Sequence, residues 1–322
     1  MQSFDVVVIN GLWLFFSYAG WKMLRKIKEA AKNKGDKVPK LFVMPHGMLD
    51  PYFQLAPERR IKAIRNYIYW HLIEKKVVND SDGLLFTSQL ELLLARKSFP
   101  DYHPKNEYNI GYGIPLPPPY SAGMKEAFLK KCPLLQGKNY LLFFGRIHPK
   151  KGVDMLVEAY LELLAKRQIK NLPVLVLAGP GMDSQFGAKI RRALALIPEA
   201  KDYVFYPGMI KGAAKWGAIY GADAFMLPSH QENFGIAVVE ALACSKPVII
   251  SDQINIWEEI KKGKGGIVTE DTISGVKNML KQWFELSAVD KKEMGENAFN
   301  VYLNNFRVER AAAKFYNVIS QR

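Results

Sequence analysis

The stretch that decides the fold is Pro228-Ser-His-Gln-Glu-Asn-Phe-Gly-Ile-Ala-Val-Val-Glu-Ala-Leu-Ala-Cys244. It follows the apolar run 224–227 and precedes a second apolar run at 248–250, so the pattern predicts a strand, a turn, a helix and a strand. Glu232 lies in the turn, and Glu240 lies a little more than one turn inside the helix. The two carboxylates are therefore expected near the carboxyl end of a buried strand.

The helix that carries Glu240 has almost no other polar residue. A carboxylate on such a helix is costly to bury unless something hydrogen-bonds it, and a ligand diol can donate two hydrogen bonds to one carboxylate. The preceding turn offers backbone N–H groups and the positive end of a helix dipole, which suit an anion or a polar ligand. On spacing alone, a capping acid followed by a salt-bridged acid is an equally good interpretation.

Two further motifs join this one. Glu232 and Glu240, with Asn-Phe-Gly after the first and Ala-Leu-Ala-Cys after the second, resemble the E-x7-E motif of GT-B retaining glycosyltransferases of family 4. Phe143-Phe-Gly-Arg-Ile-His-Pro-Lys-Lys-Gly152 and Met44-Pro-His-Gly47 resemble motifs of the same family. Because three separated motifs follow the family order, the resemblance covers nearly the whole chain.

Composition bounds the remaining possibilities. A chain of 322 residues favours two domains, and a net charge of +14 favours a partner with negative charge. Nucleic acid, an anionic membrane and a phosphorylated substrate all meet that condition, but no nucleic-acid-binding motif accompanies the charge. The two cysteines and five histidines have no metal-ligand spacing. We therefore expect no metal, no cofactor and no nucleic-acid partner. The nucleotide-diphospho-sugar that the family resemblance implies would be a donor substrate and not a cofactor.

The apolar run at 6–20 needs a separate interpretation. It is shorter than the roughly 20 residues that span a bilayer, and it contains Asn10 and Gly11. No positively charged leader precedes it, so it does not resemble a signal peptide. A buried strand at 5–9 that runs into a helix fits better, and the lack of a targeting signal predicts a cytoplasmic protein.

Strands and helices alternate along both halves of the chain. Such alternation predicts parallel sheets covered on both faces, with ligands beyond the carboxyl ends of the strands. In the first half we expect strands at 5–9, 41–44 and 84–86, an extended piece at 108–113, and helices from 12 to 33, at 58–78 and at 89–97. In the second half we expect strands at 141–144, 174–178, 204–206, 224–227 and 248–251, and helices from 152 and at 272–283, 289–304 and 308–319.

A proline-rich stretch at 111–120 predicts the junction between two domains. We expect an α/β protein with an N-terminal domain at 1–115, a linker at 116–138 and a nucleotide-sugar domain at 139–304. The resemblance implies the GT-B fold, which consists of two Rossmann-like doubly wound domains. It also implies that the last helix, at 305–322, packs back on the first domain.

A basic stretch covers residues 22–40, just after an aromatic segment. Such a combination binds anionic membrane surfaces, although a solvated helix face is the more common explanation. Only Glu29 and Asp36 oppose its eight cations. These are Lys22, Arg25, Lys26, Lys28, Lys32, Lys34, Lys37 and Lys40.

Arg146 and Lys151 flank a predicted strand-to-helix turn, with Lys150 beside them. Cations fixed next to a departing diphosphate stabilise the transition state more than the ground state, and could take the place of a divalent metal. Arginine supplies a planar fork for phosphate and lysine a compact charge. Taken alone, a basic surface turn is an equally good interpretation.

The resemblance assigns roles to particular residues. Glu232 would hold donor-sugar hydroxyls, Glu240 the ribose hydroxyls, and His46 would contact the donor sugar; on the residues alone, His46 is as readily a packed loop histidine. The implied catalytic set is His46, Arg146, Lys151 and Glu232. The implied donor-binding set is Gly145, Gly208, Met209, Asn233, Phe234, Gly235 and Glu240.

The sequence also departs from the family. About 80 residues that usually open the N-terminal domain have no counterpart, by comparison with ordinary domain sizes. Val8 and Asn10 stand where histidines are common, Ser245 stands where glycine is usual, and Gly111-Tyr-Gly113 replaces Pro-Asn-Gly. We therefore expect a shortened N-terminal domain, which a partner chain or a second copy could complete.

The resemblance implies transfer of a sugar, with retention, from a nucleotide-diphospho-sugar to a glycan or lipid-linked acceptor in polysaccharide or glycolipid biosynthesis. Two alternatives remain. One is a non-catalytic or partner-dependent nucleotide-sugar-binding protein, and the other is a basic nucleic-acid-binding protein.

Overall fold

The computed structural model describes residues 4–31, 37–166, 169 and 171–320. It divides into two compact units, Met1–Tyr112 with Glu309–Arg322, and Gly113–Val308. Lys32 and Lys34 of the basic stretch lie outside the described residues. Within the described part of the chain, no helix combines the length and the apolar character needed to cross a membrane.

The second unit is built on a parallel sheet of six strands in the order β10-β9-β8-β5-β6-β7. The strands are β5 (Tyr140–Phe144), β6 (Val174–Ala178), β7 (Val204–Gly208), β8 (Ala224–Leu227), β9 (Val248–Ser251) and β10 (Gly266–Thr269). Every residue of β6, β8 and β9 is buried, as apolar strands covered on both faces require. The strand order reverses between β5 and β8, so this sheet is doubly wound.

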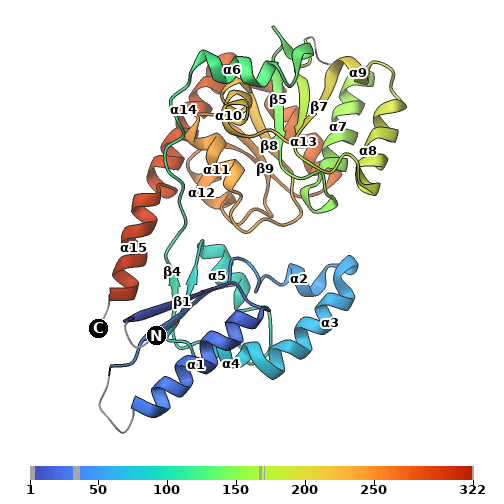
Figure 1. The fold of residues 1–322 in the computed structure, drawn as a ribbon. Helices are drawn as coiled ribbons and strands as arrows, with labels where there is room; N and C mark the ends of the chain where they lie inside the picture. The colour runs from blue at the N-terminus through green and yellow to red at the C-terminus, as the bar shows by residue number, and fades with distance from the viewer. Residues whose placement is uncertain (1–3, 32–36, 167–168, 170, 321–322) are drawn as a thin grey trace. The chain divides into compact units, whose positions relative to one another are not determined.

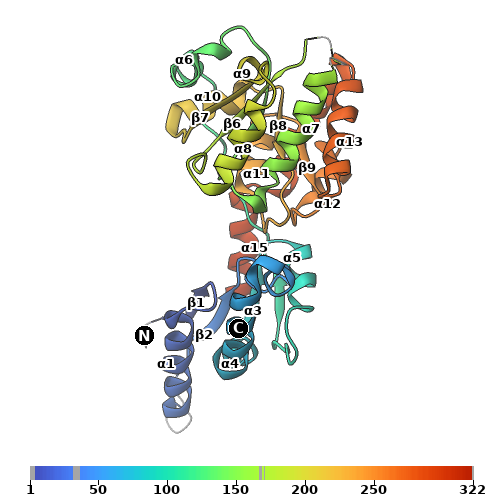
Figure 2. The same ribbon diagram turned by 90° about the vertical axis from the view of Figure 1, so that its right-hand side faces the viewer.

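Helices cover both faces of this sheet. Figures 1 and 2 show α7 (Val153–Lys166), α8 (Gln185–Ala195) and α13 (Ile273–Glu285) on one face. The other face carries α10 (Gly212–Gly221), α11 (Ile236–Ala243) and α14 (Ala288–Asn305). The shorter helices α9 (Ala200–Tyr203) and α12 (Trp257–Lys262) complete the connections. The predicted alternation of strands and helices is therefore confirmed in this unit.

The first unit contains a parallel sheet of four strands in the order β1-β2-β3-β4. Its strands are β1 (Val6–Asn10), β2 (Lys40–Met44), β3 (Gly83–Phe86) and β4 (Glu107–Asn109). Its helices are α1 (Phe15–Ala31), α2 (Tyr52–Leu55), α3 (Arg60–Tyr69), α4 (Lys75–Asp80), α5 (Gln89–Ala95) and α15 (Val308–Ser320).

Two apolar clusters stabilise the first unit. One includes Trp70, Val77 and Leu84, which are fully buried with residues of α1, β2 and α5. The second cluster is formed by Phe42, Met44, Leu85 and Ile110, and Phe315, Val318 and Ile319 of α15 pack against it. The C-terminal helix therefore covers part of a sheet made by the first 112 residues of the chain.

The helix predicted at 58–78 is present, with helical backbone from Arg60 to Asp80, but it is not a regular α-helix throughout. A 3-10 turn at Pro57–Arg59 precedes α3, and a π-helical turn at Trp70–Glu74 separates α3 from α4. The wider turn buries both Trp70 and Glu74 completely. Glu74 Oε1 accepts hydrogen bonds from Trp13 N and Ser17 Oγ, both at 2.7 Å. The interruption therefore brings a buried acceptor to the beginning of α1.

The segment predicted as a linker at 116–138 also differs from expectation. It contains α6 (Ala122–Leu129) and a 3-10 turn at Pro133–Leu135, and it belongs to the second unit. Helix α6 packs on α10 because Gly217 lets the Met124 carbonyl approach where any Cβ would collide. Phe128 of α6 is buried, with its ring centre 5.7 Å from that of Tyr140 in β5. Only the residues before α6 follow the extended path that the prolines favour.

Candidate functional site

The candidate site lies where the strand order of the second unit reverses. Adjacent strands β5 and β8 are both followed by loops that carry predicted site residues, at 145–152 and 228–235. His230 N donates to Lys150 O at 2.9 Å and so joins the two loops. Gly152 has φ +65°, and a Cβ there would collide with the Pro228 carbonyl. Ligands of doubly wound sheets bind at this kind of crevice, beyond the carboxyl ends of the strands.

Glu232 and Lys151 form an ion pair across these loops. Both side chains are largely buried, with 21% and 17% of their surfaces exposed. The Glu232 backbone is held on both sides, because its N donates to Gln253 O at 2.9 Å and its O accepts from Asn255 N at 3.0 Å. Glu232 is therefore fixed by main-chain contacts, and its carboxylate contacts Lys151 of the basic loop.

Glu240 also pairs with a lysine, which sequence reasoning missed. Lys215 Nζ lies 2.5 Å from Glu240 Oε1 and 4.3 Å from the centre of the Trp216 ring. Lys215 belongs to α10, 25 residues before its partner, and nothing in the local sequence links the two. The interpretation of Glu240 as a salt-bridged acid is therefore correct, and Lys215 adds a second cation beside the two acids.

Three glycines form an edge at the ends of β5, β6 and β7. Gly145 N donates to Ala178 O and Gly179 N donates to Gly208 O, both at 2.9 Å. A Cβ on Gly179 would collide with the Gly145 carbonyl. The ends of β5, β6 and β7 thus approach each other closely, and Met209 follows them as an exposed side chain. Gly179 is not among the predicted site residues, yet it permits this approach.

The remaining residues of the motif turn have different environments. Gly235 adopts φ +74° directly before α11, a conformation that favours glycine. Phe234 is buried and packs edge-on against Phe306 with ring centres 5.6 Å apart, so its side chain serves packing. Asn233 Oδ1 accepts from Asn255 Nδ2 at 3.4 Å. Arg146 is exposed in the loop after β5.

His46 lies in the other unit, in the loop after β2. It is exposed, has φ +52°, and its Nε2 lies 3.0 Å from Asn10 Oδ1. Partial desolvation lowers the pKa of His46, and the nearby Glu91 carboxylate opposes that shift. A lowered pKa favours the neutral imidazole at pH 7, which can accept one hydrogen bond and donate another.

Glu91 organises the loop of His46 and was also missed from sequence. It is buried and accepts from Gly47 N at 2.5 Å, from Thr87 N at 2.7 Å and from Thr87 Oγ1 at 2.5 Å. These contacts join the loops after β2 and β3. His46 and the other predicted site residues belong to different units, and its part in one common site stays a prediction.

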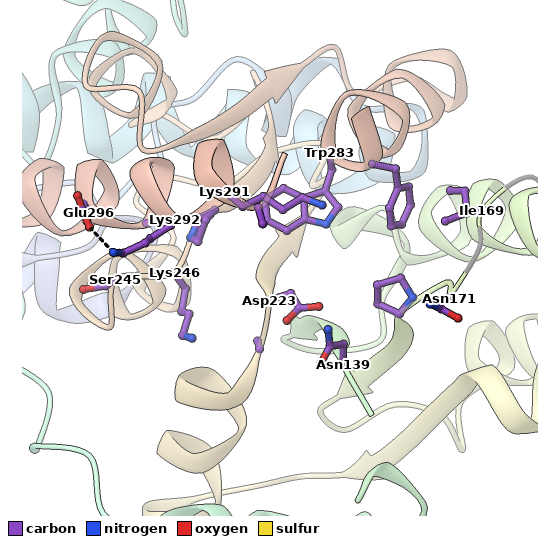
Figure 3. Close-up of a pocket in the computed structure, with 16 residues that line it drawn as sticks. Asn139, Ile169, Asn171, Asp223, Ser245, Lys246, Trp283, Lys291, Lys292 and Glu296 are labelled. Carbon is purple, nitrogen blue, oxygen red and sulfur yellow. Dashed lines mark ion pairs between the residues drawn. The ribbon is translucent and has the colours of Figure 1, made fainter. Parts of the chain in front are cut away.

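A cavity of about 680 Å³ elsewhere in the second unit is not this site. Figure 3 shows its lining, which includes Asn139, Asp223, Lys246 and Trp283. Asn139 and Asp223 directly precede β5 and β8, so the cavity lies at the amino ends of the strands, opposite the predicted residues. Among the residues that the structure describes, no group of three or more histidine, cysteine, aspartate or glutamate side chains could hold a metal ion.

The fold and the residues at the strand ends define the chain as a GT-B glycosyltransferase-like protein. The profile of the family described as glycosyl transferases group 1 matches residues 124–301, more than half of the chain. The chain therefore belongs to this family. That match lies inside the second unit, where the paired acids and the glycine edge are found.

Individual proteins agree with this assignment. D-inositol 3-phosphate glycosyltransferase of Gordonia bronchialis is 30% identical over 190 residues, which are 56% of this chain and 40% of that protein. The same enzyme of Jonesia denitrificans is 27% identical over 67% of this chain and 50% of its own length. The chain thus matches half or less of these relatives.

Solved structures share the fold. Sucrose-phosphate synthase of Thermosynechococcus elongatus has a TM-score of 0.70 at 20% identity, over 98% of this chain and 72% of its own. Anabaena HepE in complex with UDP and glucose also has a TM-score of 0.70, at 16% identity, over 99% and 78% of the two chains. The predicted fold class is confirmed.

Proposed function

We propose that the chain is a retaining glycosyltransferase that transfers a sugar from a nucleotide-diphospho-sugar to a glycan or lipid-linked acceptor, within polysaccharide or glycolipid biosynthesis in the cytoplasm. Membership of the family supports the reaction class. The observation that carries the proposal is the pairing of Glu232 with Lys151 and of Glu240 with Lys215 at the carboxyl edge of one sheet.

The two acids suit two diols of a nucleotide-sugar. A carboxylate oxygen that accepts from lysine can instead accept from vicinal hydroxyls, and the displaced lysine is then available to an anionic diphosphate. In our proposal Glu240 holds the ribose, Glu232 holds the donor sugar, and the backbone of 233–235 contacts sugar and diphosphate. Gly208 and Met209 would border the base.

The same arrangement supports stabilisation of the leaving group. The diphosphate gains charge as the glycosidic bond breaks, and cations already fixed in place need no reorganisation to stabilise that charge. We assign this task to Lys151 and Arg146 in place of a divalent ion, with His46 contacting the donor sugar. Glu232 has no nucleophilic role in the proposal, because retention is assigned to a same-face displacement assisted by the leaving phosphate.

Donor binding is tested by thermal shift of the full chain with UDP, GDP, ADP and their glucose or mannose derivatives. Ligand that binds the folded state raises the melting temperature with concentration. We expect at least one nucleotide to stabilise the parent and Glu240→Ala to lose that response. Glu285→Ala, which removes an exposed acid 3.8 Å from Lys281, is the matched control. No response from any nucleotide, or an undiminished response from Glu240→Ala, would refute the site.

Transfer is tested separately with polyprenyl-linked, glycan and inositol phosphate acceptors, the last because the curated relatives carry that name. Proton coupling at the anomeric carbon of the product should show the configuration of the donor. Product of opposite configuration would exclude retention. Loss of transfer activity on addition of EDTA would show that the reaction needs a metal ion.

A non-catalytic or partner-dependent nucleotide-sugar-binding protein is the second candidate. The observation in its favour is that both acids are already neutralised by lysines, which stabilises the site without substrate. Donor binding without hydrolysis or transfer would establish this second function. Activity that appears only with a partner chain, or only in a dimer, would establish its partner-dependent form.

A further inference from the structure

A row of exposed aliphatic side chains lies along α3 and the π-helical turn of the first unit. Ile61, Ile64, Ile68 and Leu72 expose 86%, 63%, 54% and 65% of their surfaces. Steps of three, four and four residues place side chains on one face of a helix. The opposite face is the one that packs, because Asn66 and Trp70 are buried. Four large aliphatic groups in one row form an apolar patch that single exposed residues do not.

Cations border this row. Arg60, Lys62 and Arg65 are exposed on α3, and Lys76 is exposed on α4. Glu74, an acid of the same stretch, is buried and accepts from Trp13 and Ser17, so it does not offset the surface charge. The face is therefore both aliphatic and basic.

A basic cavity adjoins the row. It measures about 540 Å³, lies between α1 and the π-helical turn, and has Leu72 in its wall. Its cations are Lys22, Arg25, Lys26 and Lys76, and Glu29 is its one acid. Tyr18 and Trp21 also line it, with Lys22 Nζ 5.2 Å from the Tyr18 ring and Arg25 Cζ 5.6 Å from the Trp21 ring.

The cations of the basic stretch at 22–40 have different surroundings. Lys28 binds Asp82 at 3.1 Å, on another part of α1. Lys22, Arg25 and Lys26 instead face the cavity together with Lys76, which lies at least 50 residues later in the chain. The fold therefore concentrates cations from α1 and α4 beside the aliphatic row.

We propose that the aliphatic row and this basic cavity form a surface that docks the first unit on an anionic phospholipid bilayer. The four aliphatic side chains enter the interface between headgroups and acyl chains, and the cavity receives lipid phosphates. A helix with an aliphatic face and basic flanks is suited to lie in the plane of a membrane. Anionic lipid attracts each nearby lysine or arginine.

Charge argues against other occupants. A second copy of the chain would bring two basic faces together, and like charges oppose such an interface. Nucleic acid would be attracted by the cations, but its phosphate backbone offers no apolar group to cover the aliphatic row. The inference adds to the proposed function but does not rest on it, because donor binding belongs to the second unit.

Sedimentation of the full chain with sucrose-loaded vesicles tests the proposal. We expect binding to phosphatidylglycerol–phosphatidylcholine vesicles and at least tenfold weaker binding to phosphatidylcholine alone. Ile61→Ser/Ile64→Ser should reduce binding about tenfold, since each exchange removes an aliphatic group from the interface. Leu196→Ser/Val289→Ser is the control, because those residues are 82% and 74% exposed on the second unit.

A second pair of variants separates local from total charge. Lys22→Glu/Lys26→Glu should reduce binding at least tenfold, whereas Lys281→Glu/Lys292→Glu, with the same change in net charge, should retain most of it. Equal losses in the two pairs, or binding by Ile61→Ser/Ile64→Ser equal to the parent, would overturn the proposal. So would a dimer by light scattering that Ile61→Ser/Ile64→Ser converts to a monomer.

Nucleotide thermal shift on every variant keeps the two proposals distinguishable. The docking variants should respond to nucleotide as the parent does, and Glu240→Ala should bind vesicles as the parent does.

Discussion

The two units hold the loops at their strand ends by different means. In the second unit, main-chain hydrogen bonds join the loops, from His230 to Lys150 and between Glu232 and the 253–255 segment. In the first unit, the side chain of Glu91 joins the loops that contain Gly47 and Thr87. The main-chain contacts of the second unit do not depend on particular side chains, whereas the loop contacts of the first unit depend on the Glu91 carboxylate.

Because of this difference, we expect substitutions in the two units to affect ligand affinity and folding stability to different degrees. In the second unit, Glu232 and Glu240 are held by lysines and can exchange those partners for ligand without disturbing the loops. Changes there should alter ligand affinity more than folding. In the first unit a comparable change should alter the fold around His46 itself.

The largest expected effect is the loss of Glu91. Glu91→Ala leaves three buried donors of Gly47 and Thr87 without their acceptor, and we expect it to destabilise the first unit by about 3 kcal/mol. Hydrogen exchange should rise in peptides around Gly47 and Thr87 and remain unchanged in the second unit. Glu29→Ala, at an exposed pair with Arg25, is the control and should cost about 0.5 kcal/mol or less. Equal losses of stability in Glu91→Ala and Glu29→Ala would show that the loops of the first unit do not depend on the Glu91 carboxylate.

A main-chain counterpart tests the second unit. Gly152→Ala introduces a Cβ against the Pro228 carbonyl at φ +65°, and we expect a loss of about 2 kcal/mol together with weaker nucleotide binding. Chemical denaturation and the nucleotide thermal shift measure the two effects. Gly123→Ala on α6 is the control, because a Cβ there meets only Ser121 Oγ at 4.0 Å, and it should be neutral or slightly stabilising. If the two variants behave alike, the loop does not depend on this close approach.

A smaller effect concerns pH. Burial raises the pKa of Glu74, and hydrogen bonds from Ser17 and Trp13 oppose that change. Because the folded-state pKa lies above the unfolded one, the stabilising contribution of this group is complete below the unfolded pKa and is lost as pH rises through the folded value. Glu74→Gln should therefore destabilise the protein more at pH 4.5 than at pH 7, in urea titrations at both values. The opposite trend would show that Glu74 is preferentially charged in the folded protein.

The smallest effect leaves stability unchanged. Burial raises the pKa of Cys244, at the end of the motif helix, to about 12. In Cys132→Ser, which leaves Cys244 as the single thiol, we expect negligible reaction with Ellman's reagent at pH 8 and rapid reaction in denaturant. Rapid labelling of the native variant would mean that the chain around Cys244, directly after α11, opens readily despite its main-chain contacts.

The sequence predicted the elements whose signals are local. Apolar runs at 141–144 and 224–227 indicated β5 and β8, and the stretch between the apolar runs at 224–227 and 248–250 indicated a turn and a helix that the structure contains. These features depend on neighbours within one strand–helix unit.

The missed features depend on distant partners. Lys215 lies in an alanine- and glycine-rich helix with no sign of its contact with Glu240, and Glu91 lies in Gln-Leu-Glu-Leu, where a glutamate resembles a surface residue. The π-helical turn at 70–74 is too short to alter the periodicity of the predicted helix. Helix α6 has eight residues next to prolines, and its contact with α10 is what favours it.

The return of α15 to the first sheet has a consequence for biosynthesis. Phe42, Met44, Leu85 and Ile110 are translated early, but Phe315, Val318 and Ile319, which cover them, emerge from the ribosome some 200 residues later. Until then the nascent chain presents an uncovered apolar sheet face, and the whole intervening unit can fold first. Chaperone dependence should therefore be greatest for ribosome-bound chains that have passed β4 and not yet released their final helix.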